Sequence, residues 1–476
     1  MDRKILIKNA KAIVSCDGED RVYRDADKLI EGPKILAIGR DLMKGQGPEG
    51  AGDLSREDIQ VIRADGKFVY PGLINTHHHF FQTFVRNLIT IDYPNMMVMD
   101  WIDKIYRIFQ NIDSDVIYYS TLTSFADLIK HGCTCAFDHQ YCYTKKTGCS
   151  PVDRQMEAAE LLGIRYHAGR GTNTLPRSEG SSIPDNMLET TDGFLKDCDR
   201  LIGLYHDSRP FSMKQIVMAP CQPINCRRET FAETVAMARD KGVRMHTHLG
   251  EGENEGMVAR WGMRTMDWCG EMGFIGEDVW YAHDWEVTKD EYKVLAATGT
   301  GVSHCPAPAV LGGFPILNIK EMQEAGILVS LGCDGSATND SSNLMDALRM
   351  AYLMQACHTK ERGGCTSAYD MLKVATINGA RTLGRPDLGS LEAGKAADLF
   401  MIDTETLELA GALHDPRNLL ARVGLTGPVW MTMINGTIVY KDGVLKGVDE
   451  RKLAREGEAV CTRVIREPHS AYRDFI

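Results

Sequence analysis

The chain has 476 residues, of which 43% are hydrophobic and 25% charged, and this balance is typical of a globular protein rather than a disordered or fibrous one. Its 54 basic and 65 acidic residues give a net charge of -11 without a basic cluster that could neutralise phosphates, so we expect no nucleic-acid partner. No run of about 18 apolar residues occurs and the first residues lack the apolar core of a secretion signal, so we expect neither a membrane partner nor export.

The 14 cysteines are scattered along the chain from Cys16 to Cys461 without a CxxC pair. This spacing argues against a cysteine zinc site and against a disulfide framework. Free thiols in an acidic chain without an export signal are typical of the reducing cytoplasm, which is the localisation that we predict.

Both ends of the chain predict short β-strands. Residues 1–68 alternate apolar and polar residues in segments such as ILIKNAKAIVS, which Gly, Asp and Pro interrupt. The same pattern returns over 386–448, where NG and DG supply turns within VWMTMINGTIVYKDGVL. We therefore predict a small β-sandwich domain built from both chain ends, followed by a charged helix and an exposed tail over 449–476.

Residues 69–385 have a different pattern, in which short apolar runs are separated by helical stretches, as in successive βα units. Eight runs are present, at 68–75, 133–138, 164–169, 215–220, 243–248, 279–283, 301–304 and 327–334. The stretches between them space apolar residues at three and four, as in ETFAETVAMARDKG. Eight runs over about 320 residues predict an α/β fold, a (β/α)8 TIM-type barrel.

Histidines and acids lie where these runs end. The first run leads into THHHFFQ, where an extended backbone turns His77 and His79 to the same side. The fifth run ends in HTHLGE, which places His246 and His248 on one face and Glu251 three residues beyond. An HxH pair by itself is equally compatible with two structural histidines.

The last three runs end at His283, at His304 and at Asp334. Because the carboxyl ends of all barrel strands surround one mouth, residues that are far apart in sequence converge there. Four metal-competent groups of mixed histidine and carboxylate type at strand ends favour a metal site over unrelated structural histidines.

Together these segments resemble the amidohydrolase superfamily, in its cytosine/guanine deaminase and triazine hydrolase branch. The resemblance extends over nearly the whole chain, and local motifs around Trp101, Asp138, Arg170 and His414 are similar to those of 8-oxoguanine deaminases and isoxanthopterin deaminases. The general motifs are PGLINTHHHFFQ, HTHLGE, the AH at 282–283, the HCP at 304–306, DGSATND and GSLEAGKAADL.

The resemblance implies that His77, His79, His248 and Asp334 hold the metal. Three imidazoles and one carboxylate suit Zn²⁺, with Fe²⁺ as the alternative. We expect one divalent ion, because the fourth run, QIVMAP, ends without the lysine that binuclear relatives carry there.

The resemblance further implies a hydrolytic deaminase that releases ammonia from a small heterocycle and uses water. Its acid/base residues fall on Glu251 and His283. We expect Glu251 or Asp334 to take a proton from the attacking water while His283 orients the oxygen. Glu251 then protonates the adjacent ring nitrogen, and Asp334 helps to move the second proton.

Gln82, Arg170 and His304 are the predicted substrate-binding residues. An amide and a guanidinium can donate to the carbonyl oxygens of a ring, which favours an oxo-purine or a pterin of the 8-oxoguanine or isoxanthopterin type. Arg170 could instead form a structural ion pair with an acid such as Asp138.

The chain departs from the family pattern in two places. Pro308 and Ala309 stand where relatives commonly have Ser and Asn, and residues 284–286, DWE, follow His283 where relatives have a small apolar stretch and another histidine. The pocket wall is therefore altered. A triazine-type hydrolase acting on hydroxyatrazine-like or chlorotriazine-like rings, a guanine or cytosine deaminase, and a catalytically silent scaffold stay open as alternatives.

Two further features leave alternatives open. Trp101 and Trp285 are expected to be packing residues rather than platforms for substrate. Family members often form homo-oligomers, but no segment of this sequence demonstrates an interface, and the oligomeric state stays open.

Overall fold

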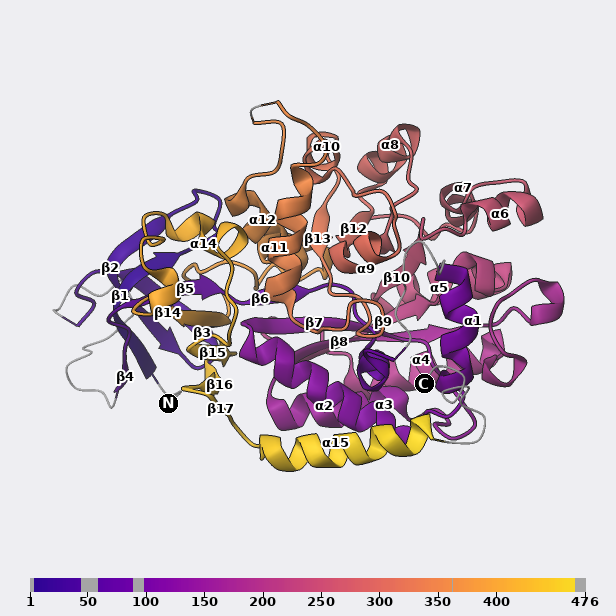
Figure 1. The fold of residues 1–476 in the computed structure, drawn as a ribbon, viewed down its shortest axis with the longest axis horizontal. Helices are drawn as coiled ribbons and strands as arrows, with labels where there is room; N and C mark the ends of the chain where they lie inside the picture. Colours follow the sequence, from indigo (N-terminus) through magenta and orange to yellow (C-terminus); the bar gives the residue numbers. More distant parts are fainter. Residues whose placement is uncertain (1–3, 44–58, 89–97, 362, 467–476) are drawn as a thin grey trace.

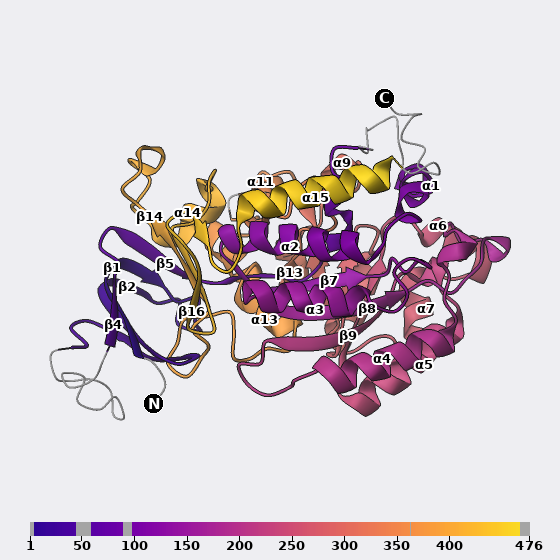
Figure 2. The same cartoon turned by 90° about the horizontal axis from the view of Figure 1, so that it is seen from below.

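The computed structural model describes residues 4–43, 59–88, 98–361 and 363–466, and two β-sheets organise them (Figure 1). An eight-stranded sheet forms a barrel, and a nine-stranded sheet lies at one end of the molecule. The view in Figure 2 shows the same arrangement from below, with the two sheets next to each other along the long axis. The predicted combination of a (β/α)8 barrel with a separate β-domain is confirmed.

The barrel strands are parallel, and each pairs with the next strand in chain order. They are β6 (Leu73–Asn75), β7 (Cys133–Gln140), β8 (Arg165–Thr172), β9 (Lys214–Pro220), β10 (Arg244–Leu249), β11 (Val279–His283), β12 (Gly301–His304) and β13 (Val329–Leu331). The Thr76 N–H donates to the Leu331 carbonyl at 3.0 Å, and the Asp334 N–H donates to the His77 carbonyl at 3.0 Å. These bonds bring the last strand back to the first, so all strand ends surround one mouth.

The nine-stranded sheet combines both ends of the chain. Its strands are β1 (Lys4–Val14), β2 (Val22–Glu31), β3 (Lys34–Gly39), β4 (Ile59–Arg63), β5 (Lys67–Pro71), β14 (Leu399–Asp403), β15 (Met431–Ile434), β16 (Thr437–Lys441) and β17 (Val444–Leu445). The expected run at 68–75 divides between the two sheets, because β5 pairs with β1 and β14 whereas β6 begins the barrel. Gly72 separates them where the chain passes Thr134, whose Oγ1 would lie 2.0 Å from a Cβ at this position.

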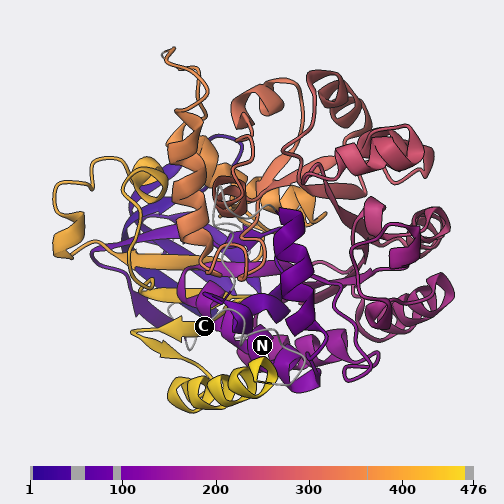
Figure 3. The same cartoon turned by 45° about the vertical axis from the view of Figure 1, so that its right-hand side comes forward.

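Helices cover the outside of the barrel and part of its mouth. The α-helices are α1 (Val98–Phe109), α2 (Ser114–Lys130), α3 (Pro151–Leu162), α4 (Thr191–Tyr205), α5 (Arg228–Lys241), α6 (Asn254–Trp261), α7 (Thr265–Glu271), α8 (Lys289–Thr298), α9 (Pro306–Leu311), α10 (Ile319–Glu324), α11 (Leu344–Gln355), α12 (Ala368–Val374), α13 (Ile377–Thr382), α14 (Pro416–Arg422) and α15 (Glu450–Ile465). Short 3₁₀ segments are η2 (Phe80–Val85), η3 (Arg177–Glu179), η4 (Asp185–Met187), η5 (Pro223–Asn225) and η6 (Leu407–Leu409). In Figure 3, α1 stands in front of the barrel strands.

The predicted C-terminal helix is α15, which runs along α2 and α3 in both Figure 1 and Figure 2. The tail expected after it falls on residues 467–476, which lie outside the described residues. None of the helices in the described part of the chain has the length and apolar character needed to cross a membrane.

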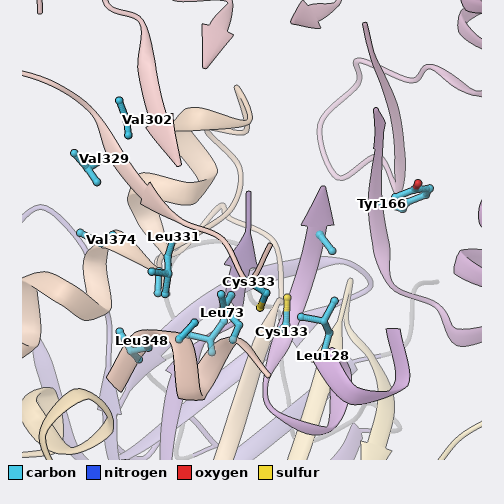
Figure 4. Close-up of a cluster of buried hydrophobic side chains, with 14 of the residues drawn as sticks. Leu73, Leu128, Cys133, Tyr166, Val302, Val329, Leu331, Cys333, Leu348 and Val374 are labelled. Atoms are coloured by element: carbon cyan, nitrogen blue, oxygen red, sulfur yellow. The ribbon is translucent and has the colours of Figure 1, made fainter. Parts of the chain in front are cut away.

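The largest hydrophobic core fills the space between the barrel strands and their helices. Figure 4 shows part of it, where Leu73 of β6 and Cys133 of β7 lie near Cys333, Leu331 of β13 lies beside them, and Val329 lies farther along β13 near Val302. These side chains are at most 1% exposed, and all fourteen cysteines of the chain are free thiols. This rigid framework fixes the strand ends that carry the polar residues.

Candidate metal centre and active site

Four side chains with metal-binding groups meet at the carboxyl end of the barrel. His77 and His79 follow β6, His248 lies in β10, and Asp334 follows β13. Nε2 of His77 and Nε2 of His79 each lie 3.2 Å from Oδ1 of Asp334, and the Nε2 atoms of His79 and His248 are 3.0 Å apart. None of the four residues is more than 5% exposed. The structure therefore brings together the four residues that the resemblance selected.

The spacing of these ligand atoms fits one divalent ion. Bonds of about 2.0–2.1 Å at tetrahedral angles place neighbouring ligand atoms about 3.3 Å apart. The ligand atoms of His77, His79 and Asp334 all lie within 4.8 Å of one another. Imidazole nitrogens and a carboxylate at this distance form a donor set that suits a borderline cation such as zinc.

Hydrogen bonds on the far side of the imidazoles fix which nitrogen faces the centre. Nδ1 of His79 donates to the backbone carbonyl of His139 at 2.9 Å, and Nδ1 of His248 donates to the carbonyl of Cys221 at 2.7 Å. With the protons held at Nδ1, both Nε2 atoms present lone pairs to the ion, as metal-binding histidines do.

His77 is fixed through a second histidine. Nδ1 of His246 donates to the carbonyl of Trp280 at 2.9 Å, so Nε2 of His246 has to act as an acceptor. Nδ1 of His77 lies 2.9 Å from that Nε2 and donates to it. The HxH pair of β10 therefore contributes one ligand, His248, and one residue that orients another ligand.

Electrostatics favour the protonation states that metal binding needs. Burial and the neighbouring imidazoles hold the pKa of His77 and His248 well below the usual value, so both rings are neutral. Burial raises the pKa of Asp334, but the close contacts with the imidazoles of His77 and His79 outweigh burial and hold this pKa well below its usual range. The carboxylate is therefore ionised at neutral pH.

Glu251 and His283 reach the same centre from the ends of β10 and β11. Oε1 of Glu251 lies 3.6 Å from Nε2 of His283, and the His283 ring stacks on that of His248 with 5.4 Å between centroids. Burial, with help from Asp334 and Glu253, raises the pKa of Glu251 well above its usual value. Burial lowers the pKa of His283 to about 4. A carboxyl group with a raised pKa beside a neutral imidazole is suited to proton transfer.

Two of these residues have an unusual backbone conformation. His283 has a φ of 79° and Asp334 a φ of 64°, both in the left-handed region that side chains with a Cβ rarely adopt. Such conformations cost about 1–3 kcal/mol each and are concentrated at functional sites. The surrounding barrel therefore stabilises a turn at each strand end that aims the side chain at the centre.

A narrow pocket opens above these groups. His79, His248, Glu251 and Asp334 form its inner end. Aromatic, apolar and thiol side chains line most of the wall, namely Trp101, Ile102, Tyr106, Tyr141, Ile183, Cys221, Trp285 and Pro308. The other lining residues are the neutral polar Gln82, Gln222, Asn225 and Thr338, so no lysine or arginine of the described residues lines it.

Two of the three predicted substrate-binding residues do not line the pocket. Gln82 does line it, where its Nε2 donates to the Tyr141 hydroxyl and its Oε1 accepts from the Ala337 N–H, both at 3.3 Å. His304 ends β12 in a fully buried position that is not part of the lining.

Arg170 is the second residue that the structure places away from the pocket. Its guanidinium donates to both carboxylate oxygens of Glu189 at 2.7 Å and to Asp197 at 2.8 Å, and it stacks 3.7 Å from the Tyr143 ring centre. Arg170 therefore forms a structural ion pair, which was the alternative to substrate binding. Its partners are Glu189 and Asp197 rather than the expected Asp138, which lies on the neighbouring strand β7. Through Glu189 and Asp197, Arg170 connects β8 to the loop that follows it and to α4.

Several residues at the site were not predicted. Trp101 of α1 and Trp285 line the wall rather than only packing in the core, and the Trp285 ring lies 4.5 Å from the His283 ring. The position of Trp285 at the site could have been predicted from the sequence, because Trp285 lies two residues after His283, which ends a strand. For Trp101, and for Tyr141 beyond β7, no sequence feature separates a wall residue from a core aromatic.

Comparisons with known proteins place this architecture in a family. The sequence profile of the amidohydrolase family matches residues 68–439. Hydroxydechloroatrazine ethylaminohydrolase from Pseudomonas sp. (strain ADP) is 51% identical over 454 residues, covering 95% of this chain and 94% of that protein. 8-Oxoguanine deaminase from Pseudomonas aeruginosa is 31% identical over 462 residues, covering 96% of this chain and 98% of that protein. A crystal structure of atrazine chlorohydrolase from Arthrobacter aurescens complexed with zinc has a TM-score of 0.89 and 31% identity, over 96% of this chain and 100% of that chain.

The chain belongs to the amidohydrolase family, and the resemblance drawn from its motifs is confirmed. It is a hydrolytic enzyme with a TIM barrel that acts on C–N bonds. His77, His79 and Asp334 form a candidate metal site, His248 adjoins it through His79, and zinc is present in a structural relative.

Proposed function

We propose that the protein is a zinc-dependent aminohydrolase that replaces an alkylamino group on a hydroxylated triazine ring with a hydroxyl group from water. The relative that is 51% identical over almost its whole length is named for this reaction type. The sequence favours an oxo-purine or a pterin, with a triazine ring as the alternative, and the similarity to this relative gives the triazine ring precedence.

The observation that carries the proposal is the combination of the metal centre with the wall above it. Four ligand atoms and the Glu251–His283 pair converge at one end of a pocket whose other lining residues are aromatic, apolar or neutral. Neutral rings with alkyl substituents suit such a wall, because burial of their apolar surface is favourable at about 25 cal/mol per Å².

The position of Arg170 weakens the case for an oxo-purine. The guanidinium expected to bind a ring oxygen is bonded to Glu189 and Asp197 instead. A ligand with several ring carbonyls would then depend on neutral donors such as Gln82, Gln222 and Asn225. Hydroxytriazines need fewer such contacts.

In the proposed hydrolysis, each residue at the centre has a separate role. His77, His79, His248 and Asp334 would hold a divalent ion, which would supply a water molecule with a lowered pKa as the nucleophile at neutral pH. Glu251 accepts the proton of the attacking water and donates it to the adjacent ring nitrogen, while His283 donates a hydrogen bond that orients the oxygen. The tetrahedral ring carbon then expels the amine, and Asp334 assists the transfer of the second proton to the leaving nitrogen.

A substrate panel with metal analysis tests the proposal. The purified enzyme is assayed on a bis(alkylamino)hydroxytriazine, a chlorotriazine, 8-oxoguanine and isoxanthopterin, with released amine or ammonia measured and zinc content determined on the same sample. We expect kcat/KM on the alkylaminohydroxytriazine to exceed that on the other rings by at least about 100-fold, or roughly 2.7 kcal/mol of transition-state discrimination.

A second candidate, an oxo-purine or pterin deaminase, is favoured by two relatives that are 31% identical, an 8-oxoguanine deaminase and an isoxanthopterin deaminase. Ammonia release from 8-oxoguanine or isoxanthopterin at a higher kcat/KM than amine release from the triazine would establish this candidate instead. Zinc-loaded protein with no activity on any ring would contradict both.

A further inference from the structure

Glu251 lies on a loop that has little rigidity of its own. The loop joins β10 to α6, and Glu251 is flanked by Gly250 and Gly252, whose φ angles are 69° and 99°. Glycine at both flanks gives the backbone a wide choice of conformations. Something outside these residues must therefore hold the carboxyl group of Glu251 near His283.

Glu253 supplies two of the contacts that hold this loop. One of its carboxylate oxygens accepts the N–H of Gly250 at 2.6 Å, and the other accepts the N–H of Glu251 at 2.6 Å. Its side chain is almost fully buried, with 3% of the residue exposed. Short bonds from backbone N–H groups to a buried carboxylate are stronger than bonds between neutral groups, so this contact restrains the loop effectively.

Glu286 connects the same loop to the loop that carries His283. Its Oε2 accepts from the Gly252 N–H at 3.2 Å and from Nδ2 of Asn254 at 2.8 Å. The backbone adds two bonds, from Asp284 N–H to the Leu249 carbonyl at 2.8 Å and from Glu286 N–H to the Gly250 carbonyl at 3.1 Å. The segment DWE, which departs from the family pattern, is therefore part of this connection.

We propose that Glu253 is a positioning residue that holds Glu251 at its place beside His283 by bonding both backbone N–H groups at the base of the loop. The proposal rests on the proton-transfer role of Glu251 in the proposed function. Glu253 does not line the pocket itself and contacts the site through the backbone of Gly250 and Glu251, so its effect on the reaction passes through Glu251. Glu286 fixes the second half of the loop in the same way.

The test compares Glu253→Gln and Glu253→Ala with Glu255→Gln as the matched control. Glu255 lies on the same helix start but is exposed. Displacement of a reacting group by about 1 Å can cost about 100-fold in rate, so we expect kcat to fall about 100-fold in the alanine variant. The glutamine variant keeps one acceptor oxygen and should fall less. KM, zinc content and the control variant should stay within about threefold of the wild type.

A double substitution separates positioning from general damage. If Glu253 acts through Glu251, adding Glu253→Ala to Glu251→Gln should change the residual kcat by less than about threefold, because the group being positioned is already disabled. The proposal is overturned if the two substitutions reduce kcat multiplicatively, or if Glu253→Ala alone keeps wild-type kcat. The measurements use whichever ring the wild type turns over best, so a different substrate would refute the proposed function without affecting this result.

Discussion

Replacement of His246 tests how the metal centre is built. His246 is fully buried and accepts a hydrogen bond from Nδ1 of His77, while its own Nδ1 donates to the Trp280 carbonyl. His246→Met fills similar space between the rings of Phe137 and Trp280, both 4.7 Å away, but cannot accept this bond well. His77 is then left with a buried N–H that has no strong partner.

The expected loss of metal affinity follows from the missing hydrogen bond between His77 and His246. A buried donor without a partner costs about 1–3 kcal/mol, and at 1.36 kcal/mol per factor of ten this corresponds to roughly 5- to 150-fold weaker metal binding. Outer hydrogen bonds to metal-binding histidines are typically worth about 10- to 100-fold in affinity, which agrees with this range.

The assay is zinc affinity by competition with a chromophoric chelator, together with kcat at saturating zinc. His246→Gln is the control, because a glutamine oxygen can take the place of Nε2 and accept from His77. We expect the methionine variant to bind zinc about 5- to 150-fold more weakly and the glutamine variant to lie nearer the wild type. Equal zinc affinities for the methionine variant and the wild type would refute the proposed orientation of His77.

Four other outcomes are expected. Glu251→Gln should lower kcat by about 10²- to 10⁴-fold with zinc content unchanged in metal analysis, and near-normal turnover would remove its role in proton transfer. Arg170→Met should lower the free energy of unfolding in urea by about 3 kcal/mol, because Glu189 loses its guanidinium partner and Asp197 keeps only Arg200, with KM unaltered; a changed KM and normal stability would favour substrate binding instead. Removal of metal by a chelator should abolish activity and lower the melting temperature, with zinc restoring both, and an active metal-free protein would contradict the metal centre. Burial opposes the charged form of His131, but the neighbouring Asp127 outweighs burial and raises the pKa of His131 above 6.5. The stability that the His131–Asp127 pair contributes is therefore present at low pH and is lost as pH rises through that raised pKa. The stability difference between the wild type and His131→Asn should therefore be larger at pH 6 than at pH 9 in urea denaturation, and an equal difference at both values would contradict this pair.

Much of the fold could be predicted because it depends on local patterns. The run CTCAFD becomes β7 and the run VWYAH becomes β11, since a buried parallel strand needs a continuous apolar segment whatever its neighbours are. The first run, 68–75, was less well defined. Its apolar pattern does not reveal that Gly72 divides it between two sheets, because only the approach of Thr134 requires a glycine there.

The convergence of the proposed metal-binding residues could also be predicted from the sequence. His77 and His79 lie two apart in extended chain, and barrel topology alone brings His248 and Asp334 to the same mouth. Arg170 shows the limit of this reasoning. It ends a barrel strand like the ligands do, yet two acids from the following segment bind it away from the pocket.

The order of residues along the chain was enough to predict the eight strands and their shared mouth, since these depend on periodicity and on the parallel direction of the strands. The resemblance to the amidohydrolase family, rather than periodicity, selected the side chains proposed to hold a cation there. Only the tertiary structure decided which side chains form the wall. Trp101 lies on α1 and Trp285 lies in the turn after β11, and both positions depend on packing between segments far apart in sequence. Packing contacts between distant segments depend on how their shapes fit together in three dimensions, and they produce no repeating pattern of residues in the sequence.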